Sequence, residues 1–208
     1  MILKNSFVDG VVLYEELRDQ DIAVVYERAL VMLLNKFISL QEFKEILEIK
    51  NSLKFSQSIS ARYMIFKYLS EKYPSHKISL TRDSSGLPYL IGILKFVSIS
   101  HSNKMVVVAI ANHNIGIDTE YINKPFPKII SNNWNIEEQQ FNPYHIWTAK
   151  ESYLKLLGCG LQKKISDISV KCLQNDTNII IDLNHEVKVL SKTIFVNDYV
   201  ITITKPKV

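Results

Sequence analysis

The chain has 208 residues, of which 47% are hydrophobic and 22% are charged. These proportions are those of a folded globular protein and exclude a disordered chain. Its 25 basic and 21 acidic residues leave a net charge of +4. That excess suits an anionic ligand or an acidic protein partner, but it is too small to indicate nucleic-acid binding.

The expected absence of targeting signals and the spacing of the two cysteines predict a cytoplasmic protein. Residues 1–6 lack a basic region followed by an apolar run, so we expect no signal peptide. The longest apolar runs, such as residues 105–111, are far shorter than the roughly 20 residues of a spanning helix, which predicts no membrane contact. Cys159 and Cys172 have no metal-ligand spacing and are expected to be free thiols in a reducing compartment; a disulfide between them is the alternative.

The first part of the chain predicts one strand followed by two helices. The strand is expected at residues 10–14. A long helix is expected from about residue 21 to 50, because its apolar residues recur at helical spacing. A second helix is expected from about residue 58 to 73, where Pro74 marks its end.

The middle of the chain predicts strands separated by turns. Residues 83–88 contain serine, glycine and proline and have the composition of a turn. Three strands are then expected, at residues 95–100, 105–111 and 115–119. A turn at residues 112–114 connects the last two.

The last part of the chain predicts a helix followed by four strands. Two prolines disfavour helix at residues 123–127, so a rigid link is expected there. Residues 136–157 are predicted to be helical with a break at Pro143, and the glycines at 158 and 160 stop the helix. Four strands follow, at residues 168–173, 178–183, 186–190 and 199–204.

Each half of the chain therefore combines helices with three or four strands. This order is α+β, because strands and helices do not alternate as in βαβ folds. We predict two similar lobes, an N-terminal lobe at residues 1–111 and a C-terminal lobe at residues 112–208.

Three acidic residues suggest a metal site. Asp118 and Glu120 lie two apart near a strand end, so both side chains leave one face. Glu151 lies in an otherwise apolar and aromatic helix. Carboxylates packed together repel by ~4 kcal/mol per pair at 4 Å and an effective dielectric of about 20. A Mg²⁺ or Mn²⁺ ion would remove this penalty and favour phosphate oxygens as further ligands. The alternative is that the acids are simply solvated.

Two basic residues could serve a phosphate bound to that metal. Lys155 lies one helical turn beyond Glu151 and shares its face. It is either a surface ion-pair partner or a group that neutralises charge and protonates a leaving oxygen. His101 lies in a segment rich in hydrogen-bond donors, which suits a phosphate, although a structural histidine is the alternative. We reject a Ser–His hydrolase, because adjacent strand residues point to opposite faces.

Four segments follow one another in a specific order: Gly86-Leu-Pro88, Ser98-Ile-Ser-His-Ser102, Ile115-Gly-Ile-Asp-Thr-Glu120 and Trp147-Thr-Ala-Lys-Glu-Ser-Tyr-Leu-Lys-Leu-Leu-Gly-Cys-Gly160. In this order and spacing the sequence resembles the surfactin-type 4′-phosphopantetheinyl transferases. The resemblance covers about residues 56–170, a little over half of the chain. It implies a two-lobed α+β monomer with pseudo-twofold symmetry and an active site in the cleft between the lobes.

The resemblance also implies an activity. The family transfers 4′-phosphopantetheine from coenzyme A to a serine of an apo acyl or peptidyl carrier protein and releases adenosine 3′,5′-bisphosphate. A role in secondary metabolism is expected, with fatty-acid carrier activation as a further alternative. The two-lobed length favours the broad-specificity branch, because the dedicated fatty-acid form is usually a single lobe that trimerises.

The family's functional residues carry over to matching positions. Asp118, Glu120 and Glu151 would hold Mg²⁺ on the coenzyme A pyrophosphate, with Mn²⁺ as an alternative. Asp118, Glu151 and Lys155 are the implied catalytic residues, with Glu151 as the candidate base and Lys155 assisting the leaving group. The implied coenzyme A-binding residues are Ser58, Gly86, Pro88, His101, Ser102, Asn103, Lys104 and Lys155.

The sequence departs from the family pattern at a few positions. Leu87 replaces a lysine of the Gly-Lys-Pro loop, with Arg82 and Lys54 as candidate substitutes, and Gln57 stands where an arginine is usual. Thr119 replaces the isoleucine between the two acids. These departures motivate an alternative function, a non-catalytic module of the same fold that binds coenzyme A or a carrier protein.

Overall fold

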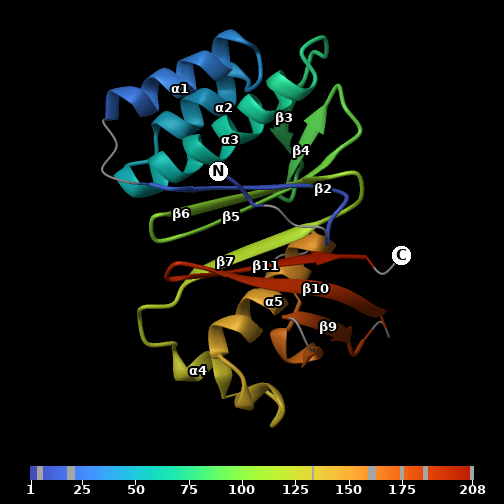
Figure 1. Cartoon of the computed structure of the whole chain (residues 1–208). Helices are drawn as coiled ribbons and strands as arrows, with labels where there is room; N and C mark the ends of the chain where they lie inside the picture. Colours follow the sequence, from blue (N-terminus) through green and yellow to red (C-terminus); the bar gives the residue numbers. More distant parts are fainter. Residues whose placement is uncertain are drawn as a thin grey trace.

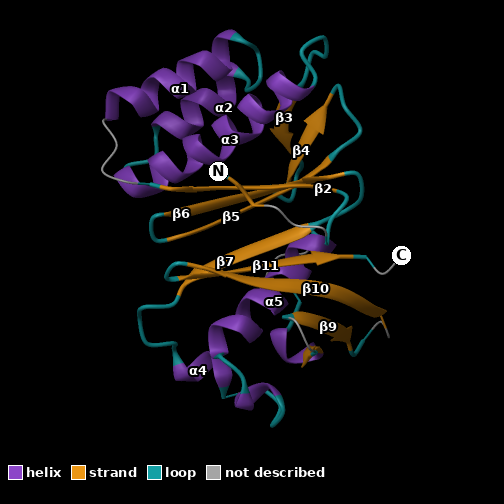
Figure 2. Cartoon of the chain, viewed as in Figure 1, coloured by secondary structure: helices purple, strands orange, loops and turns teal. Residues whose placement is uncertain are grey.

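The computed structural model describes residues 1–3, 7–17, 22–132, 134–158, 163–173, 176–184 and 187–206. Two antiparallel sheets lie in the middle of the molecule, with three helices above them and the remaining helices below (Figure 1). The described residues therefore form an α+β fold, as the sequence predicts. Figure 2 shows the same arrangement by type of element.

The first sheet has the strand order β1-β2-β6-β5. These strands are β1 (Ile2–Leu3), β2 (Gly10–Glu16), β6 (Met105–Ala111) and β5 (Phe96–Ser102). Its helices are α1 (Ile22–Leu34), α2 (Leu40–Leu47) and α3 (Ser52–Lys72). Buried side chains of these helices, such as Ile59 and Ile65, pack against strand residues such as Val106 and Val108 to form one hydrophobic core.

The second sheet has the strand order β7-β11-β10-β9-β8. Its strands are β7 (Gly116–Tyr121), β11 (Tyr199–Lys205), β10 (Val187–Val196), β9 (Thr177–Asp182) and β8 (Ile168–Cys172). Below it lie α4 (Lys128–Ser131), the short 3₁₀ turns η1 (Glu138–Gln140) and η3 (Ile165–Asp167), and α5 (Pro143–Leu157). Residues of α5, including Ile146, Ala149 and Tyr153, form a core with this sheet.

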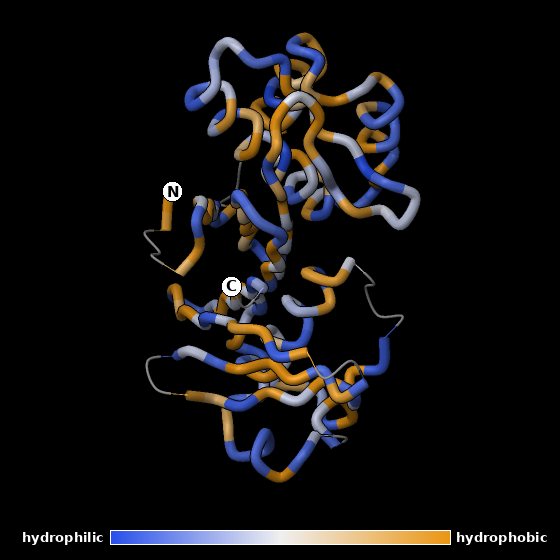
Figure 3. Tube along the Cα trace, turned by 90° about the vertical axis from the view of Figure 1, so that its right-hand side faces the viewer, coloured by the Kyte–Doolittle hydropathy of each residue, from blue (hydrophilic) through white to orange (hydrophobic). Residues whose placement is uncertain are grey.

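A third core joins the two sheets. Val107 and Ala109 of β6 pack with Ile117 of β7 and with Ile201 and Ile203 of β11. The molecule is therefore layered as helices, sheet, sheet and helices. In Figure 3 hydrophobic and hydrophilic stretches alternate along the chain in both halves, as expected where elements bury one face and expose the other.

The predicted long helix at residues 21–50 is wrong. The structure has two helices there, and Ser39 caps the second by accepting a hydrogen bond from the Glu42 amide. The chain turns before it at Lys36, whose φ of 57° is incompatible with continued helix. Phe37 and Ile38 in this turn are buried, so their apolar character reflects core packing and not helical periodicity.

Other boundaries also differ from the sequence prediction. Helix α3 begins at Ser52 and not near residue 58, because Asn51 caps it by accepting from the Lys54 amide. The predicted turn at residues 83–88 is confirmed, but the hairpin strands that flank it, β3 (Ser79–Arg82) and β4 (Pro88–Ile91), were not predicted, nor was β1. Strand β10 extends to Val196, beyond the predicted residue 190.

Helix α5, which carries two of the candidate site residues, has clear signals at both ends. Asn142 accepts a hydrogen bond from the Tyr144 amide, and Pro143 is the first helical residue. Pro143 therefore starts the helix and does not break it, and the helix ends at Gly158 with a φ of 72°. Cys159 and Gly160 lie outside the described residues.

A buried ion pair anchors α5 from below. Lys150 Nζ lies 2.9 Å from Glu138 Oε2 in η1, and both side chains are 1% exposed. The other oxygen of Glu138 accepts a hydrogen bond from the Val170 amide of β8. Because breaking such a buried pair costs several kcal/mol, this contact ties α5 to η1 and to the far edge of the sheet.

Two further sequence expectations concern thiols and membranes. Cys172 is a free, partly buried thiol, and burial raises its pKa to about 11. Among the helices of the described ranges, none has the length and apolar character required to cross a bilayer.

Candidate functional site

Three serines of β5 join the two sheets. Ser98, Ser100 and Ser102 occupy alternate positions, so all three side chains leave one face of the strand. Ser98 Oγ accepts a hydrogen bond from the Ile117 amide at 3.1 Å, and Ser102 Oγ accepts one from the Tyr121 amide at 3.1 Å. Strand β7 is at the edge of its sheet, so these hydroxyls satisfy amides that lack a neighbouring strand.

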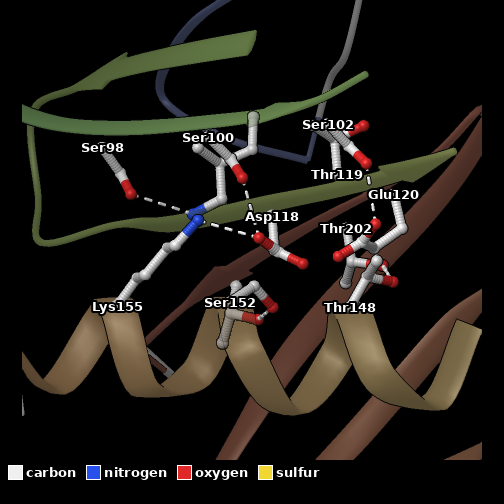
Figure 4. Close-up of polar contacts among 12 residues, drawn as sticks. Ser98, Ser100, Ser102, Asp118, Thr119, Glu120, Thr148, Ser152, Lys155 and Thr202 are labelled. Carbon is white, nitrogen blue, oxygen red and sulfur yellow. Dashed lines mark hydrogen bonds and ion pairs between the residues drawn. The ribbon is translucent and has the colours of Figure 1, made fainter. Parts of the chain in front are cut away.

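The same row of serines orients two acidic side chains. Ser100 Oγ donates to Asp118 Oδ1 at 2.8 Å, and Ser102 Oγ donates to Glu120 Oε2 at 2.7 Å (Figure 4). Asp118 is buried and Glu120 is partly buried. Asp118 and Glu120 therefore share one face of β7, as the sequence predicts, and a hydroxyl from the other sheet holds each of them.

Helix α5 supplies the opposite side of the site. Lys155 extends from the helix toward β7, and its Nζ lies 2.8 Å from Asp118 Oδ1 (Figure 4). Glu151 lies one turn earlier on α5 and is partly buried. Lys155 is therefore in contact with Asp118, and the charges of Asp118 and Glu120 act on Glu151.

Two carboxylate oxygens in this cluster lack a partner. Among the described residues, Asp118 Oδ2 and Glu151 Oε1 are buried without a hydrogen bond. Burial, together with the negative charge of Asp118, raises the pKa of Glu151 to about 7. A buried acceptor without a donor is costly. Lys155 therefore offsets only part of the negative charge of Asp118 and Glu151, whereas Glu120 pairs with Lys124, whose Nζ lies 3.6 Å from Glu120 Oε2.

The two unpartnered oxygens, Asp118 Oδ2 and Glu151 Oε1, suit a hard cation, because such cations favour carboxylate oxygens as ligands. In the described parts of the chain, no three His, Cys, Asp or Glu side chains are arranged as a complete metal-binding group. Instead, Asp118 faces Lys155. The cluster therefore offers free ligand atoms from β7 and α5 without a closed cage.

A cavity of about 740 Å³ adjoins the cluster. It is lined by the β3–β4 hairpin loop, by β4, β5 and β7, and by the end of α5. Six of the predicted site residues line it: Gly86, Pro88, His101, Asp118, Glu120 and Lys155. Arg82 and Lys95 line it as well, so the cavity is bordered by several basic groups and suits an anion.

His101 stands at one wall of this cavity. Its side chain is exposed, but neighbouring atoms desolvate the ring, and this together with the positive charge of Lys155 lowers its pKa. The neutral ring can donate only one hydrogen bond. A nearby anion would favour the protonated form, which donates two.

Five predicted residues do not line the cavity: Ser58, Ser102, Asn103, Lys104 and Glu151. Ser58 Oγ accepts from Arg62 Nη1 at 2.8 Å, and Arg62 in turn pairs with Glu42. Ser102 is engaged with Glu120, as described above. Asn103 and Lys104 form the turn between β5 and β6, where Asn103 has a φ of 47°.

The residues that depart from the family pattern have structural contacts. Gln57 Nε2 donates to the Asn103 carbonyl oxygen at 2.6 Å, so it holds the β5–β6 turn. Leu87 lies against Gly158, where an added Cβ would be 2.6 Å from Leu87 Cδ1. Thr119 donates to the Val200 carbonyl oxygen at 3.0 Å. Leu87 therefore connects the hairpin loop to the end of α5.

Sequence reasoning missed the structural role of Ser98 and Ser100. Their spacing of two residues is a signal that could have been used, because alternate polar residues on an apolar strand indicate one polar face. The partners of that face could not be identified, since Asp118 and Ile117 lie 18 and 19 residues further along the chain.

Parts of this chain are similar to known proteins. Residues 114–204, which include Asp118, Glu120, Glu151 and Lys155, match the family model of the 4′-phosphopantetheinyl transferase superfamily. The 4′-phosphopantetheinyl transferase gsp of Aneurinibacillus migulanus is 30% identical over 152 residues, which cover 67% of this chain and 62% of that protein. The 4′-phosphopantetheinyl transferase Sfp of Bacillus subtilis (strain 168) is 33% identical over 98 residues, which cover 41% of this chain and 43% of that protein.

A further 4′-phosphopantetheinyl transferase of Bacillus subtilis is 30% identical over 125 residues, covering 51% of this chain and 52% of that protein. The chain thus spans less than two thirds of the length of each of these three relatives.

The uncompensated charge predicts an unusual stabilising substitution. Glu151→Gln removes one of the facing carboxylates and should raise the free energy of unfolding of the metal-free protein by on the order of 1 kcal/mol. Urea denaturation in the presence of a chelator measures this change. Glu137→Gln is the matched control, because Glu137 is exposed and should leave stability unchanged. Equal stabilities for the two variants, or a less stable Glu151→Gln variant, would contradict the electrostatic description of the site.

Proposed function

Because the chain belongs to the 4′-phosphopantetheinyl transferase superfamily, we propose that it transfers 4′-phosphopantetheine from coenzyme A to a serine of an apo carrier protein. The observation that carries this proposal is the meeting of Lys155 and Glu151 with Asp118 beside a cavity bordered by basic groups. An acid, a base and an anion-binding cavity are the groups that phosphoryl transfer to a hydroxyl requires.

We propose that Asp118, Glu120 and Glu151 hold Mg²⁺, or Mn²⁺ in its place. The two unpartnered oxygens, on Asp118 and Glu151, support this assignment because both are buried and lack a donor. When bound, the metal supplies positive charge to the pyrophosphate oxygens of coenzyme A. Lys155 then no longer has to compensate Asp118 and is free to turn toward a phosphate.

Each side chain has a role in the proposed reaction. Glu151 accepts the proton of the carrier serine, whose oxygen forms a bond to the phosphorus on the pantetheine side of the pyrophosphate. The bond from that phosphorus to the bridging oxygen breaks, and adenosine 3′,5′-bisphosphate leaves. Lys155 balances the charge that develops on the leaving oxygen. His101 binds the pyrophosphate from the facing strand.

The cavity is the proposed site of coenzyme A. Gly86 and Pro88 shape the loop beneath the adenine, and both line the cavity. Ser58 of α3, Ser102 of β5, and Asn103 and Lys104 of the β5–β6 turn do not line it, so the cavity gives no support to their proposed contacts with the nucleotide. Arg82, which lines the cavity and donates to the Gly86 carbonyl oxygen at 2.7 Å, is the better candidate for the contact that Leu87 cannot make.

The organisation of the proposed enzyme follows from the same family. We propose two similar lobes, residues 1–111 and 112–208, with pseudo-twofold symmetry and the active site between them. The end of β6 at Ala111 and the start of β7 at Gly116 support this boundary. A monomer acting in the cytoplasm on an acyl or peptidyl carrier protein of secondary metabolism completes the proposal. The non-catalytic alternative loses its motivation, because Leu87 and Gln57 have structural contacts.

A transfer assay tests the proposed function. The full chain, coenzyme A and Mg²⁺ are incubated with a panel of apo acyl and peptidyl carrier proteins, and intact-mass spectrometry follows the carrier. We expect the mass of one phosphopantetheine group on the carrier serine, and no change when a chelator replaces Mg²⁺. If no carrier gains mass while a known transferase modifies the same panel, the proposed function is wrong.

Lys155→Ala tests the assignment of the leaving-group residue. Loss of a group that stabilises or protonates the leaving oxygen should lower kcat by ~10²–10⁴-fold. Stopped transfer reactions analysed by mass spectrometry give the rate. Lys164→Ala, which removes an exposed lysine beyond α5, should transfer at the unmodified rate. Near-normal transfer by Lys155→Ala would exclude Lys155 from the chemistry.

A further inference from the structure

We propose that two buried hydroxyl contacts between α5 and β11 fix the helix in register and thereby hold Glu151 and Lys155 over Asp118. The contacts join Thr148 to Thr202 and Ser152 to Thr204. The inference rests on the proposed function, because it assigns positioning residues to that site. We call this set of four residues the hydroxyl latch.

The hydroxyl latch is fully buried and its two contacts are short. Thr148 Oγ1 lies 2.7 Å from Thr202 Oγ1, and Ser152 Oγ lies 2.6 Å from Thr204 Oγ1. All four residues are 0% exposed. Residues four apart share a helix face and residues two apart share a strand face. Two contacts one turn apart resist both sliding and rotation of α5, whereas a single contact would allow the helix to pivot.

The pairing of β7 with β11 links the latch directly to the site. Thr202 lies opposite Asp118, and Thr204 lies opposite Gly116. The backbone of α5 comes close to β7 at this point, since a Cβ added to Gly116 would lie 1.8 Å from the Ser152 carbonyl oxygen. Gly116 thus sets the distance of α5 from the sheet, and the hydroxyls set its position along the sheet.

The position of α5 determines the contact that the site requires. Glu151 directly precedes Ser152 on α5, and Lys155 lies three residues after Ser152. Figure 4 shows Thr148, Ser152 and Lys155 rising from the same side of α5 toward the strands. A slip of one residue would move the helix by about 1.5 Å and rotate it by about 100°. Such a slip would break the 2.8 Å contact between Lys155 and Asp118.

Hydroxyl groups suit this purpose better than apolar groups. Hydrophobic contacts are non-directional and tolerate sliding, whereas hydrogen bonds weaken steeply when misaligned. A shifted helix would lose both hydrogen bonds to β11, although Thr148 and Ser152 would keep their hydrogen bonds to carbonyl oxygens of α5. The latch therefore disfavours neighbouring registers even where they would bury similar apolar area.

The hydroxyl latch is continuous with a wider buried network. Thr202 Oγ1 also lies 3.0 Å from Thr193 Oγ1. Thr193 Oγ1 in turn accepts a hydrogen bond from Asn178 Nδ2 at 3.1 Å. Asn178 Oδ1 lies 3.0 Å from His145 Nε2, which returns the network to α5 near its start. This network therefore contacts α5 at His145, Thr148 and Ser152. These contacts extend over β9, β10 and β11.

Paired variants of Thr202 test this inference. Thr202→Val keeps the shape of the side chain and removes its hydroxyl, and Thr202→Ser keeps the hydroxyl. Ser191→Ala is the matched control, because Ser191 is also 0% exposed and receives its hydrogen bond from Asn178, not from α5. For each full-length variant, calorimetry with Mn²⁺ in the presence of coenzyme A gives metal affinity. Steady-state transfer gives kcat and KM.

We expect Thr202→Val to lower the Mn²⁺ affinity about tenfold and kcat about tenfold. Removal of a group that orients metal ligands usually has effects of this size. KM for the carrier protein should change little, because the latch is remote from any surface. Thr202→Ser should match the unmodified chain in both measurements. Ser191→Ala should lose thermal stability comparable to Thr202→Val, yet retain its Mn²⁺ affinity and kcat.

The outcomes separate this inference from the proposed function. If Thr202→Val binds Mn²⁺ and transfers like Ser191→Ala, the latch does not position the site, although the transfer activity stands. If the unmodified chain binds Mn²⁺ but transfers to no carrier, the proposed function fails, and the Mn²⁺ affinities of the two Thr202 variants still decide on the latch. An unmodified chain that binds no Mn²⁺ overturns the inference. Should Thr202→Val fail to fold, Ser152→Ala breaks the second contact and is measured in the same way.

Discussion

The repulsion among three acidic side chains at the junction of the two sheets is the constraint on which the rest of this molecule depends. Among the residues that the structure describes, Asp118 and Glu151 each have one buried oxygen without a hydrogen-bond partner, and Lys155 lies 2.8 Å from Asp118. A fold gains no stability from such an arrangement. The surrounding elements must therefore hold the acids in place against their own repulsion.

Both halves of the molecule contribute to this restraint. The first sheet presents a row of serines whose hydroxyls hold Asp118 and Glu120. The second sheet carries the acids on β7 and fixes α5 through buried hydroxyls of β11. The ion pair between Lys150 and Glu138 anchors α5 from its other side. Hydrogen bonds and close packing elsewhere thus stabilise a site whose facing carboxylates are unfavourable by themselves.

Much of this architecture follows from local sequence pattern. The strand at residues 105–111 was predicted with the bounds that the structure has, because it is a continuous apolar run between turn signals. The end of α5 at Gly158 was equally clear, since only glycine adopts a left-handed conformation at little cost. The shared face of Asp118 and Glu120 needed only the period of a strand.

Features that depend on distant contacts could not be predicted. Apolar Phe37 and Ile38 resemble the continuation of a helix, but they enter the core from a turn. The hairpin of β3 and β4 has short strands whose pairing appears only in the folded chain. The serine row and the hydroxyl latch join residues between 18 and 54 positions apart, and no local pattern identifies such partners.

A crystal of the full chain soaked with coenzyme A and Mn²⁺ tests the central claim most directly, since anomalous scattering locates the metal. We predict one Mn²⁺ ion coordinated by oxygens of Asp118, Glu120 and Glu151 and by the pyrophosphate of coenzyme A. Lys155 should have left Asp118 for a phosphate oxygen. Coenzyme A bound without a metal peak between these acids, with Lys155 still paired to Asp118, would contradict the account.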